Sequence, residues 1–192
     1  MKIAGAALFL FAALSLAAHA ADPATIAKCE ACHGLHGDST SGTVPRLNGQ
    51  QPDYLRLRLR EFLDPTRGTP HATYQMWETA TELGDRTAAE LSQYFGSQAP
   101  TPAAPQGALA AKGAAIYREG AGPNAPACQT CHGAAGEGRG TAPRLAGQHA
   151  EYLNLQLSAF MLSLRVHETM NPTARHLDAD QIKALTAHLG NR

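Results

Sequence analysis

The sequence predicts an all-α protein made of two tandem copies of one module. Landmark residues of the first half return in the same order in the second half, at offsets of 94 to 99 residues. Apolar residues recur every three to four positions in the middle of each half, which is the spacing of a helix that faces a core. No convincing alternation of polar and apolar residues indicates a strand. A proline-rich stretch separates the two halves.

Residues 1–20 are predicted to be a secretory signal peptide. Lys2 supplies the positive start, Ile3 to Ala18 is an uncharged apolar run, and Ala18-His19-Ala20 matches a small-x-small cleavage site. Cleavage there makes Ala21 the mature N-terminus. The alternative is an uncleaved anchor, but the apolar run is shorter than the ~20 residues that span a bilayer.

The first module, residues 21–96, is predicted to contain three helices. Asp22 can cap the first, with Pro23 at its first position, and this helix leads into Cys29. The other two are expected at residues 52–63 and at about 87–95, where Gly96 ends the last one. The middle helix places four apolar side chains on one face: Leu55, Leu59, Phe62 and Leu63.

The second module, residues 108–192, repeats this plan. A helix is expected from Ala108 to Glu119, with Gly120 as its stop, and the last helix runs from about residue 180 to 189 before Gly190. The middle helix, at residues 149–163, again has one apolar face, formed by Leu153, Leu157, Phe160 and Met161. The halves are therefore a duplication of one unit and not a long solenoid.

The expected linker is residues 97–107, which contain Pro100, Pro102 and Pro105. Proline-rich segments are extended and semi-rigid, at about 3.1 Å per residue. A connection of this length allows two small domains to lie side by side.

The pentapeptide Cys-x-x-Cys-His occurs once in each module, as Cys29 to His33 and as Cys128 to His132. This pattern is typical of covalent c-type haem attachment: Cys29 with Cys32, and Cys128 with Cys131, bond one haem each. His33 and His132 then ligate the two irons. Two disulfides or one zinc site are alternatives. Two disulfides would leave the His after each pair unexplained. A zinc site would need both Cys pairs as ligands, but the pairs are 99 residues apart and each lies in its own half of the chain.

The second axial ligand of each iron decides between an electron carrier and a catalyst, because an open position admits oxygen or peroxide. Met76 and Met170 lie at matching positions late in each module, in polar stretches that look turn-like. We therefore expect these two methionines to be the axial ligands. Histidine is the competing ligand. The candidates are His36, His71, His149, His167, His176 and His188, of which His71 and His167 lie closest to the methionines in sequence.

The segments Pro-Arg-Leu-x-Gly-Gln at residues 45–50 and 143–148 are predicted to support the haems. A ligating imidazole usually donates its other N–H to an acceptor, and the carbonyls of Pro45 and Pro143 are the candidates. Arg46 and Arg144 are candidates for pairing with haem propionates. Ordinary solvated charges are the alternative. Gln50, Gln148, Tyr54 and Tyr152 are further candidates for the propionates, although conservation of a fold after duplication explains them equally well.

Together these motifs resemble the dihaem cytochromes c4, over about residues 22–189. The two Cys-x-x-Cys-His-Gly motifs, the two Pro-Arg-Leu-x-Gly-Gln segments followed by Tyr-Leu, and one late Met per half carry the resemblance. It implies two class I cytochrome c domains related by a pseudo-twofold axis, with His/Met ligation at both irons. It also implies a periplasmic protein that shuttles electrons from a quinol-oxidising complex to a terminal oxidase.

Two other functions remain open at this stage. The chain is alternatively the electron-accepting subunit of a dehydrogenase, such as a sulfide-oxidising flavoprotein, or a dihaem peroxidase-type enzyme. The charge balance argues against nucleic acid as a partner, since 16 basic residues face 16 acidic ones. Partners are expected to be redox proteins in transient complexes, and loose membrane association stays open.

Overall fold

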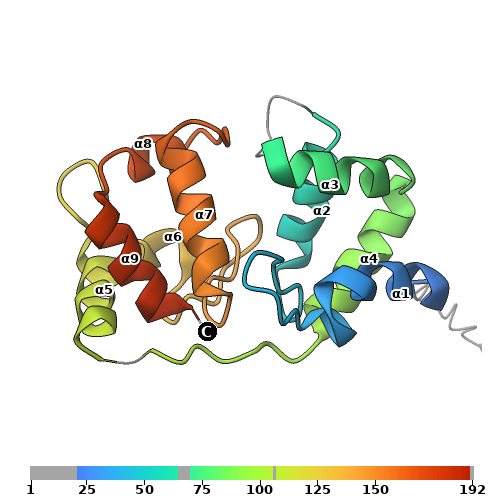
Figure 1. Cartoon of the computed structure of the whole chain (residues 1–192), viewed down its shortest axis with the longest axis horizontal. Coiled ribbons are helices and arrows are strands. Elements are labelled where there is room, and N and C mark those ends of the chain that lie inside the picture. The colour runs from blue at the N-terminus through green and yellow to red at the C-terminus, as the bar shows by residue number, and fades with distance from the viewer. Residues whose placement is uncertain (1–20, 65–69, 106, 191–192) are drawn as a thin grey trace, which may run out of the picture.

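The computed structural model describes residues 21–64, 70–105 and 107–190. The all-α prediction is confirmed: these residues form helices and no β-strand, with one isolated bridge between Arg139 and Ala142. Two helical lobes lie side by side, and an extended segment joins them (Figure 1). The predicted signal peptide lies outside the described residues. Within them, no helix is both long and apolar enough to cross a bilayer.

The first lobe has four α-helices and one 3-10 turn. As predicted, the Asp22 side chain caps the first helix by accepting a hydrogen bond from the Thr25 N–H, at 2.9 Å. The helix at residues 70–81 was not predicted, since its sequence has no clear apolar face. The elements are α1 (Pro23–His33), η1 (Leu35–Gly37), α2 (Pro52–Glu61), α3 (Pro70–Thr81) and α4 (Asp85–Ser97).

The second lobe contains five helices. Its last helix starts slightly before the expected position because Asp178 and Gln181 form a reciprocal capping box. The helix at residues 129–132 is short and carries the second pentapeptide. The elements are α5 (Gly107–Glu119), α6 (Gln129–His132), α7 (Ala150–Met161), α8 (Met170–Ala174) and α9 (Ala179–Leu189).

Each lobe has its own small apolar core. Leu91 and Phe95 of α4 are almost fully buried in the first lobe, and Tyr117 and Leu185 are in the second. Helices α5 and α9 pack so closely that a Cβ at Gly113 would overlap the Ala184 backbone. Small cores of this kind leave room for a cofactor to complete the apolar interior.

Helix α2 corrects one prediction about its apolar face. Leu55 is buried as expected, but Leu63 is 46% exposed and lies beyond the end of the helix. The other buried side chains of α2 are Arg58 and Glu61, which form an ion pair. This face of α2 therefore buries charge as well as apolar surface. The corresponding helix α7 agrees with the prediction, since Leu153 and Phe160 are buried.

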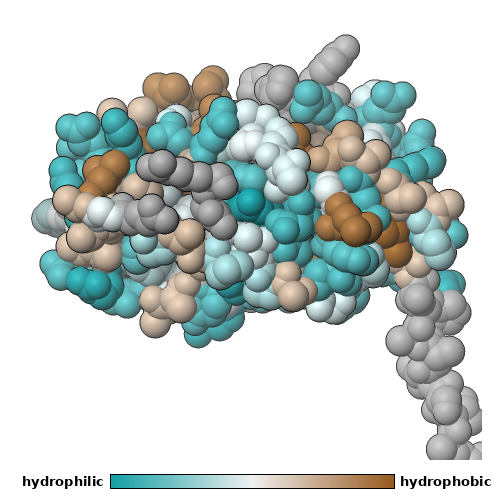
Figure 2. All heavy atoms as spheres, turned by 60° about the horizontal axis from the view of Figure 1, so that its bottom comes forward, coloured by the Kyte–Doolittle hydropathy of each residue, from teal (hydrophilic) through white to brown (hydrophobic). Residues whose placement is uncertain are grey.

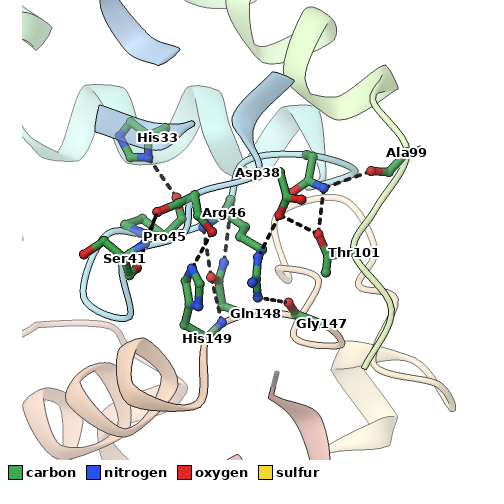
Figure 3. Close-up of polar contacts among 12 residues, drawn as sticks. His33, Asp38, Ser41, Pro45, Arg46, Ala99, Thr101, Gly147, Gln148 and His149 are labelled. Atoms are coloured by element: carbon green, nitrogen blue, oxygen red, sulfur yellow. Dashed lines mark hydrogen bonds and ion pairs between the residues drawn. The ribbon is translucent and has the colours of Figure 1, made fainter. Parts of the chain in front are cut away.

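Residues 98–105 run in an extended conformation against loops of both lobes. The Asn48 amide donates hydrogen bonds to Ala99 O at 2.9 Å and to Thr101 Oγ1 at 3.0 Å (Figure 3). The Thr101 hydroxyl donates to Asp38 at 2.7 Å. In the second lobe, a Cβ at Gly147 would overlap the Thr101 carbonyl. The middle of the segment at residues 98–105 is therefore held against the surface of both lobes.

The face of the molecule shown in Figure 2 carries hydrophobic residues only in small, separate patches.

Candidate functional site

Both pentapeptides end a helix at a buried histidine. His33 is the last residue of α1 and His132 the last of α6, and they are 8% and 7% exposed. The chain then turns through Gly34 and Gly133 at φ values of 78° and 84°, a conformation that favours glycine. A Cβ at Gly34 would also overlap the Asp38 backbone. The glycine after each histidine thus lets the chain turn sharply away from the ring.

The predicted carbonyl partners of the two histidines are confirmed. The Nδ1 atoms of His33 and His132 lie 2.8 and 2.9 Å from the carbonyl oxygens of Pro45 and Pro143 (Figure 3 for the first). Because a carbonyl only accepts, Nδ1 is the protonated nitrogen and Nε2 keeps its lone pair. This is the tautomer that binds a metal through Nε2.

Burial keeps both rings in the neutral form that metal ligation requires. Desolvation lowers the pKa of His33, and the hydrogen bond to Pro45 opposes that effect only in part. Desolvation lowers the pKa of His132 in the same way, and the nearby His167 adds to the decrease.

None of the four cysteines forms a disulfide in the structure. Cys29 and Cys128 are half-buried beside the two apolar cores, and burial raises the pKa of both thiols. Cys32 and Cys131 are exposed. Among the described residues, no three His, Cys, Asp or Glu side chains converge as a metal-binding cluster.

Met76 and Met170 are both half-buried, and neither belongs to an apolar core. The expected turn-like setting is wrong for Met76, which lies within α3. Met170 is the first residue of α8 and directly follows an irregular segment. Both side chains are thus half-buried outside these two clusters, which is compatible with ligation.

Asn171 fixes the segment that carries Met170, a role that the sequence did not indicate. Its buried amide donates hydrogen bonds to Phe160 O at 2.7 Å and to Arg165 O at 2.8 Å. Its Oδ1 accepts from the His167 N–H. The Asn171 side chain therefore links the Met170 segment to the last turn of α7 and to the residues that follow that helix.

The competing histidines have varied surroundings. His167 Nδ1 accepts the N–H groups of Thr169 and Met170, at 3.2 and 3.3 Å, and its Nε2 has no hydrogen bond to any described residue. His149 is engaged elsewhere, since its buried Nε2 lies 2.9 Å from the Ser39 carbonyl of the other lobe. The His71 side chain lies outside the described residues. Of the two histidines nearest in sequence to the methionines, the structure thus describes the side chain of His167 but not that of His71.

A cavity of about 650 Å³ lies beside the Met170 segment. Its volume is in the range of small-molecule and cofactor sites. Both lobes contribute to its wall, since Leu57 and Glu61 come from α2. The other lining residues are Thr141, Ser163, Val166, His167, Glu168, Asn171, Pro172 and Arg175. A group bound here would therefore contact both modules.

The two Pro-Arg-Leu-x-Gly-Gln segments meet across the interface and exchange hydrogen bonds. The Gln148 side chain accepts from the Arg46 N–H at 2.9 Å and donates to the Arg46 carbonyl at 3.0 Å (Figure 3). Gln50 makes the same two bonds to Arg144, at 2.6 and 2.9 Å. This reciprocity is the local form of a pseudo-twofold relation. It also gives the two glutamines a role that differs from the expected contact with propionates.

The two arginines of these segments bind protein groups. Arg46 Nε donates to Asp38 at 2.8 Å, and its Nη1 donates to the Gly147 carbonyl at 2.8 Å. Arg144 Nε donates to the Ala146 carbonyl at 3.1 Å. Arg46 therefore contributes directly to the contact between the lobes.

Comparison with known proteins shows which family has this sequence and fold. The family model "Cytochrome c" matches residues 110–192. A cytochrome c4 from Thiocapsa roseopersicina is 36% identical over 84% of this chain and 85% of its own length. The chain belongs to the cytochrome c4 family. The solved cytochrome c4 of Acidithiobacillus ferrooxidans has a TM-score of 0.79 and 36% identity, covering 85% of this chain and 98% of that one.

A second type of relative has a more specific name. A "Thiosulfate dehydrogenase electron acceptor" from Stutzerimonas stutzeri is 44% identical over 89% of this chain and 81% of its own length. The match spans both modules. By its name, that relative accepts electrons from a thiosulfate dehydrogenase.

Membership of the cytochrome c4 family means that the chain carries covalently attached haem c, and the two motifs provide for two such groups. The residues fit this cofactor. Each module offers a pair of free thiols three positions apart, followed by a buried neutral imidazole with Nε2 available. A cavity bordered by both lobes lies beside Met170.

Proposed function

We propose that His33 and Met76 are the axial ligands of one haem iron, and His132 and Met170 those of the other. Cys29 with Cys32, and Cys128 with Cys131, form the thioether attachments. The observation that carries this assignment is the buried imidazole of each motif, whose Nδ1 is committed to a proline carbonyl. The half-buried methionines outside the cores support the second ligand.

The resulting function is one-electron transfer, and haem c supplies that chemistry when it is bound. The protein keeps the two imidazoles neutral, with Nε2 available to the iron. The methionine ligands, Met76 and Met170, occupy the second axial position of each iron and so exclude oxygen and peroxide. The domains proposed for this work are residues 21–96 and 108–192, joined by residues 97–107.

The carrier is proposed to be periplasmic and to take electrons from a quinol-oxidising complex to a terminal oxidase. Its support is family membership together with the expected signal peptide at residues 1–20. Partners are bound transiently, as is usual for redox encounters. N-terminal sequencing of the exported protein tests the cleavage before Ala21, and an N-terminus at Met1 would contradict it.

A second candidate is the role of electron acceptor for a thiosulfate-oxidising dehydrogenase. The 44% identity to an acceptor of that name favours it, and the cofactor chemistry is unchanged. This candidate is more specific than the flavoprotein partner expected from the sequence, but it belongs to the same class of function. The two candidates differ only in the electron donor.

The deciding experiment follows reduction of the purified holoprotein by each donor in a stopped-flow spectrometer. Fast reduction by a quinol-oxidising complex, with slow reduction by a thiosulfate dehydrogenase, supports the respiratory carrier. The reverse order supports the acceptor role. Peroxide turnover by the reduced protein would instead point to the peroxidase alternative, because it requires an open iron.

A further inference from the structure

One peptide unit in each module takes part in two hydrogen bonds at once. The Pro45 carbonyl accepts from His33 Nδ1, and the N–H of the same peptide belongs to Arg46 and donates to Gln148 Oε1. The second module repeats this: the Pro143 carbonyl accepts from His132, and the Arg144 N–H donates to Gln50 Oε1. We call each sequence of imidazole, peptide and glutamine a relay.

The relays cross the interface between the modules. The first begins at His33 and ends at Gln148 in the second module, and the other begins at His132 and ends at Gln50 in the first. Both glutamines are buried: Gln148 is 7% exposed and Gln50 is 6% exposed. Water therefore has little access to compete for the N–H groups that the glutamines accept.

The orientation of both amides is determined by their surroundings. Each Nε2 donates to an arginine carbonyl, which cannot donate in return. Each Oε1 accepts a second backbone N–H as well, from His149 in one case and Gln51 in the other, at 3.0 and 2.9 Å. A flipped amide would place NH₂ against these donors, so the acceptor oxygen must face the relay peptide.

Hydrogen bonds in series polarise one another. An acceptor at the peptide N–H makes the carbonyl of that peptide a better acceptor for the imidazole Nδ1–H. A more strongly held Nδ1–H gives the ring more imidazolate character, and this raises its basicity toward a metal. A more basic axial ligand favours the ferric state and lowers the reduction potential.

We propose that Gln148 and Gln50 are crossed positioning residues: each tunes the axial histidine of the module to which it does not belong. This inference rests on the axial ligands proposed above. Each haem's potential is thus set partly by the other module, so correct docking of the modules is a condition for the native pair of potentials.

The test is a redox titration of the holoprotein followed by proton NMR, with resolved resonances assigned to each haem. Gln148→Met keeps the side-chain length but removes the acceptor, so the first haem should shift to higher potential while the second stays nearly constant. Gln50→Met should give the opposite pattern. Gln51→Met is the matched control, because its Nε2 also bridges the modules, to Glu137 O at 2.9 Å, outside either relay.

Two outcomes would overturn the relay. One is a shift of both potentials by the same amount in Gln148→Met and Gln51→Met, which indicates general loosening. The other is a larger shift at the haem of the mutated module. Gln148→Glu provides a second reading if Gln148→Met does not mature, since a carboxylate acceptor should lower the first haem's potential. A wild-type spectrum without histidine-ligated low-spin haem would refute the ligand assignment itself.

Discussion

Arg165 of the second module reaches Tyr54 of the first, with its Nη2 3.4 Å from the tyrosine hydroxyl. Arg165 is 6% exposed, and its guanidinium donates to Gln156 Oε1 at 2.7 Å and lies over the Phe160 ring at 4.5 Å. Its hydrogen bonds go to neutral groups, while the nearby Glu61 carboxylate, which is paired with Arg58, also stabilises its charge. A buried cation at the interface is electrostatically demanding, so its few hydrogen bonds carry weight.

Replacing Arg165 should weaken the contact between the modules. In Arg165→Met, the partly buried acceptors of Gln156 and Tyr54 lose a donor, and we expect the free energy of unfolding to fall by about 1–3 kcal/mol. Urea unfolding of the holoprotein measures this. Arg175→Met is the control, because Arg175 makes an exposed hydrogen bond to Ser163 and should cost less than about 0.5 kcal/mol. Equal losses in the two variants would contradict a special role for the buried guanidinium.

The burial of His149 at the interface between the modules should make the protein less stable in acid. Burial, with help from Arg46, lowers the pKa of His149, and the Ser39 carbonyl opposes this only in part. The unfolded chain therefore binds a proton near pH 6.5 that the folded protein takes up only at lower pH. Stability is expected to fall as the pH drops below about 6.5, the unfolded pKa.

His149→Gln keeps a donor for the Ser39 carbonyl but does not titrate. Thermal unfolding between pH 7.5 and pH 5 should show a smaller loss of stability in this variant than in the wild type. An identical pH dependence would mean that other groups, and not His149, cause the acid sensitivity.

The parts of the site that sequence reasoning predicted depend on local patterns. The pentapeptides, the helix cap at Asp22 and the proline carbonyls all involve residues within about a dozen positions of one another. Helix α3 was missed although Pro70 is a reasonable first residue, because the segment has no apolar face. Its position matters for Met76, which lies on a helix and not in a turn.

The parts that were missed are contacts between the modules. A repeat indicates that Gln50 and Gln148 have the same role, but it cannot tell that each acts on the other copy. Arg165 gave no signal either, since arginine is usually exposed. Interface contacts depend on how two cores dock, and single-chain periodicity does not encode that geometry.

Loss of Met170 should change one haem and leave the other intact. Axial ligands set haem potentials over roughly 0.8 V, and a thioether favours the reduced iron. We expect Met170→Ala to lower one potential by on the order of 0.1 V and to let that iron bind carbon monoxide when reduced. Visible spectra and potentiometry measure both effects.

Met161→Ala is the matched control, because Met161 is partly buried against the core of the second lobe. It should reduce stability without opening an iron. Carbon monoxide binding in Met161→Ala, or its absence in Met170→Ala, would move the ligand assignment to another residue, with His167 as the first alternative.

The amide of Asn171 should keep the Met170 segment in place. Asn171→Ala removes the amide donor that the carbonyls of Phe160 and Arg165 share, which should cost about 1–3 kcal/mol. The methionine-to-iron absorption of the oxidised protein should weaken at a lower temperature than in the wild type. Thr173→Ala, which removes only an exposed hydrogen bond to Thr169, should leave that temperature unchanged.

The cofactor itself should be needed for folding. The cores of both lobes are small, and the buried imidazoles of His33 and His132 are each held by a single hydrogen bond to a loop carbonyl. A chain made without haem attachment, as in Cys29→Ser/Cys32→Ser/Cys128→Ser/Cys131→Ser, loses the apolar surface that the helices would cover. We expect its far-ultraviolet circular dichroism to show well below native helix content, with no cooperative thermal transition. Native-like helicity with a sharp transition would mean that the protein alone specifies the fold, and that the haems enter a preformed scaffold.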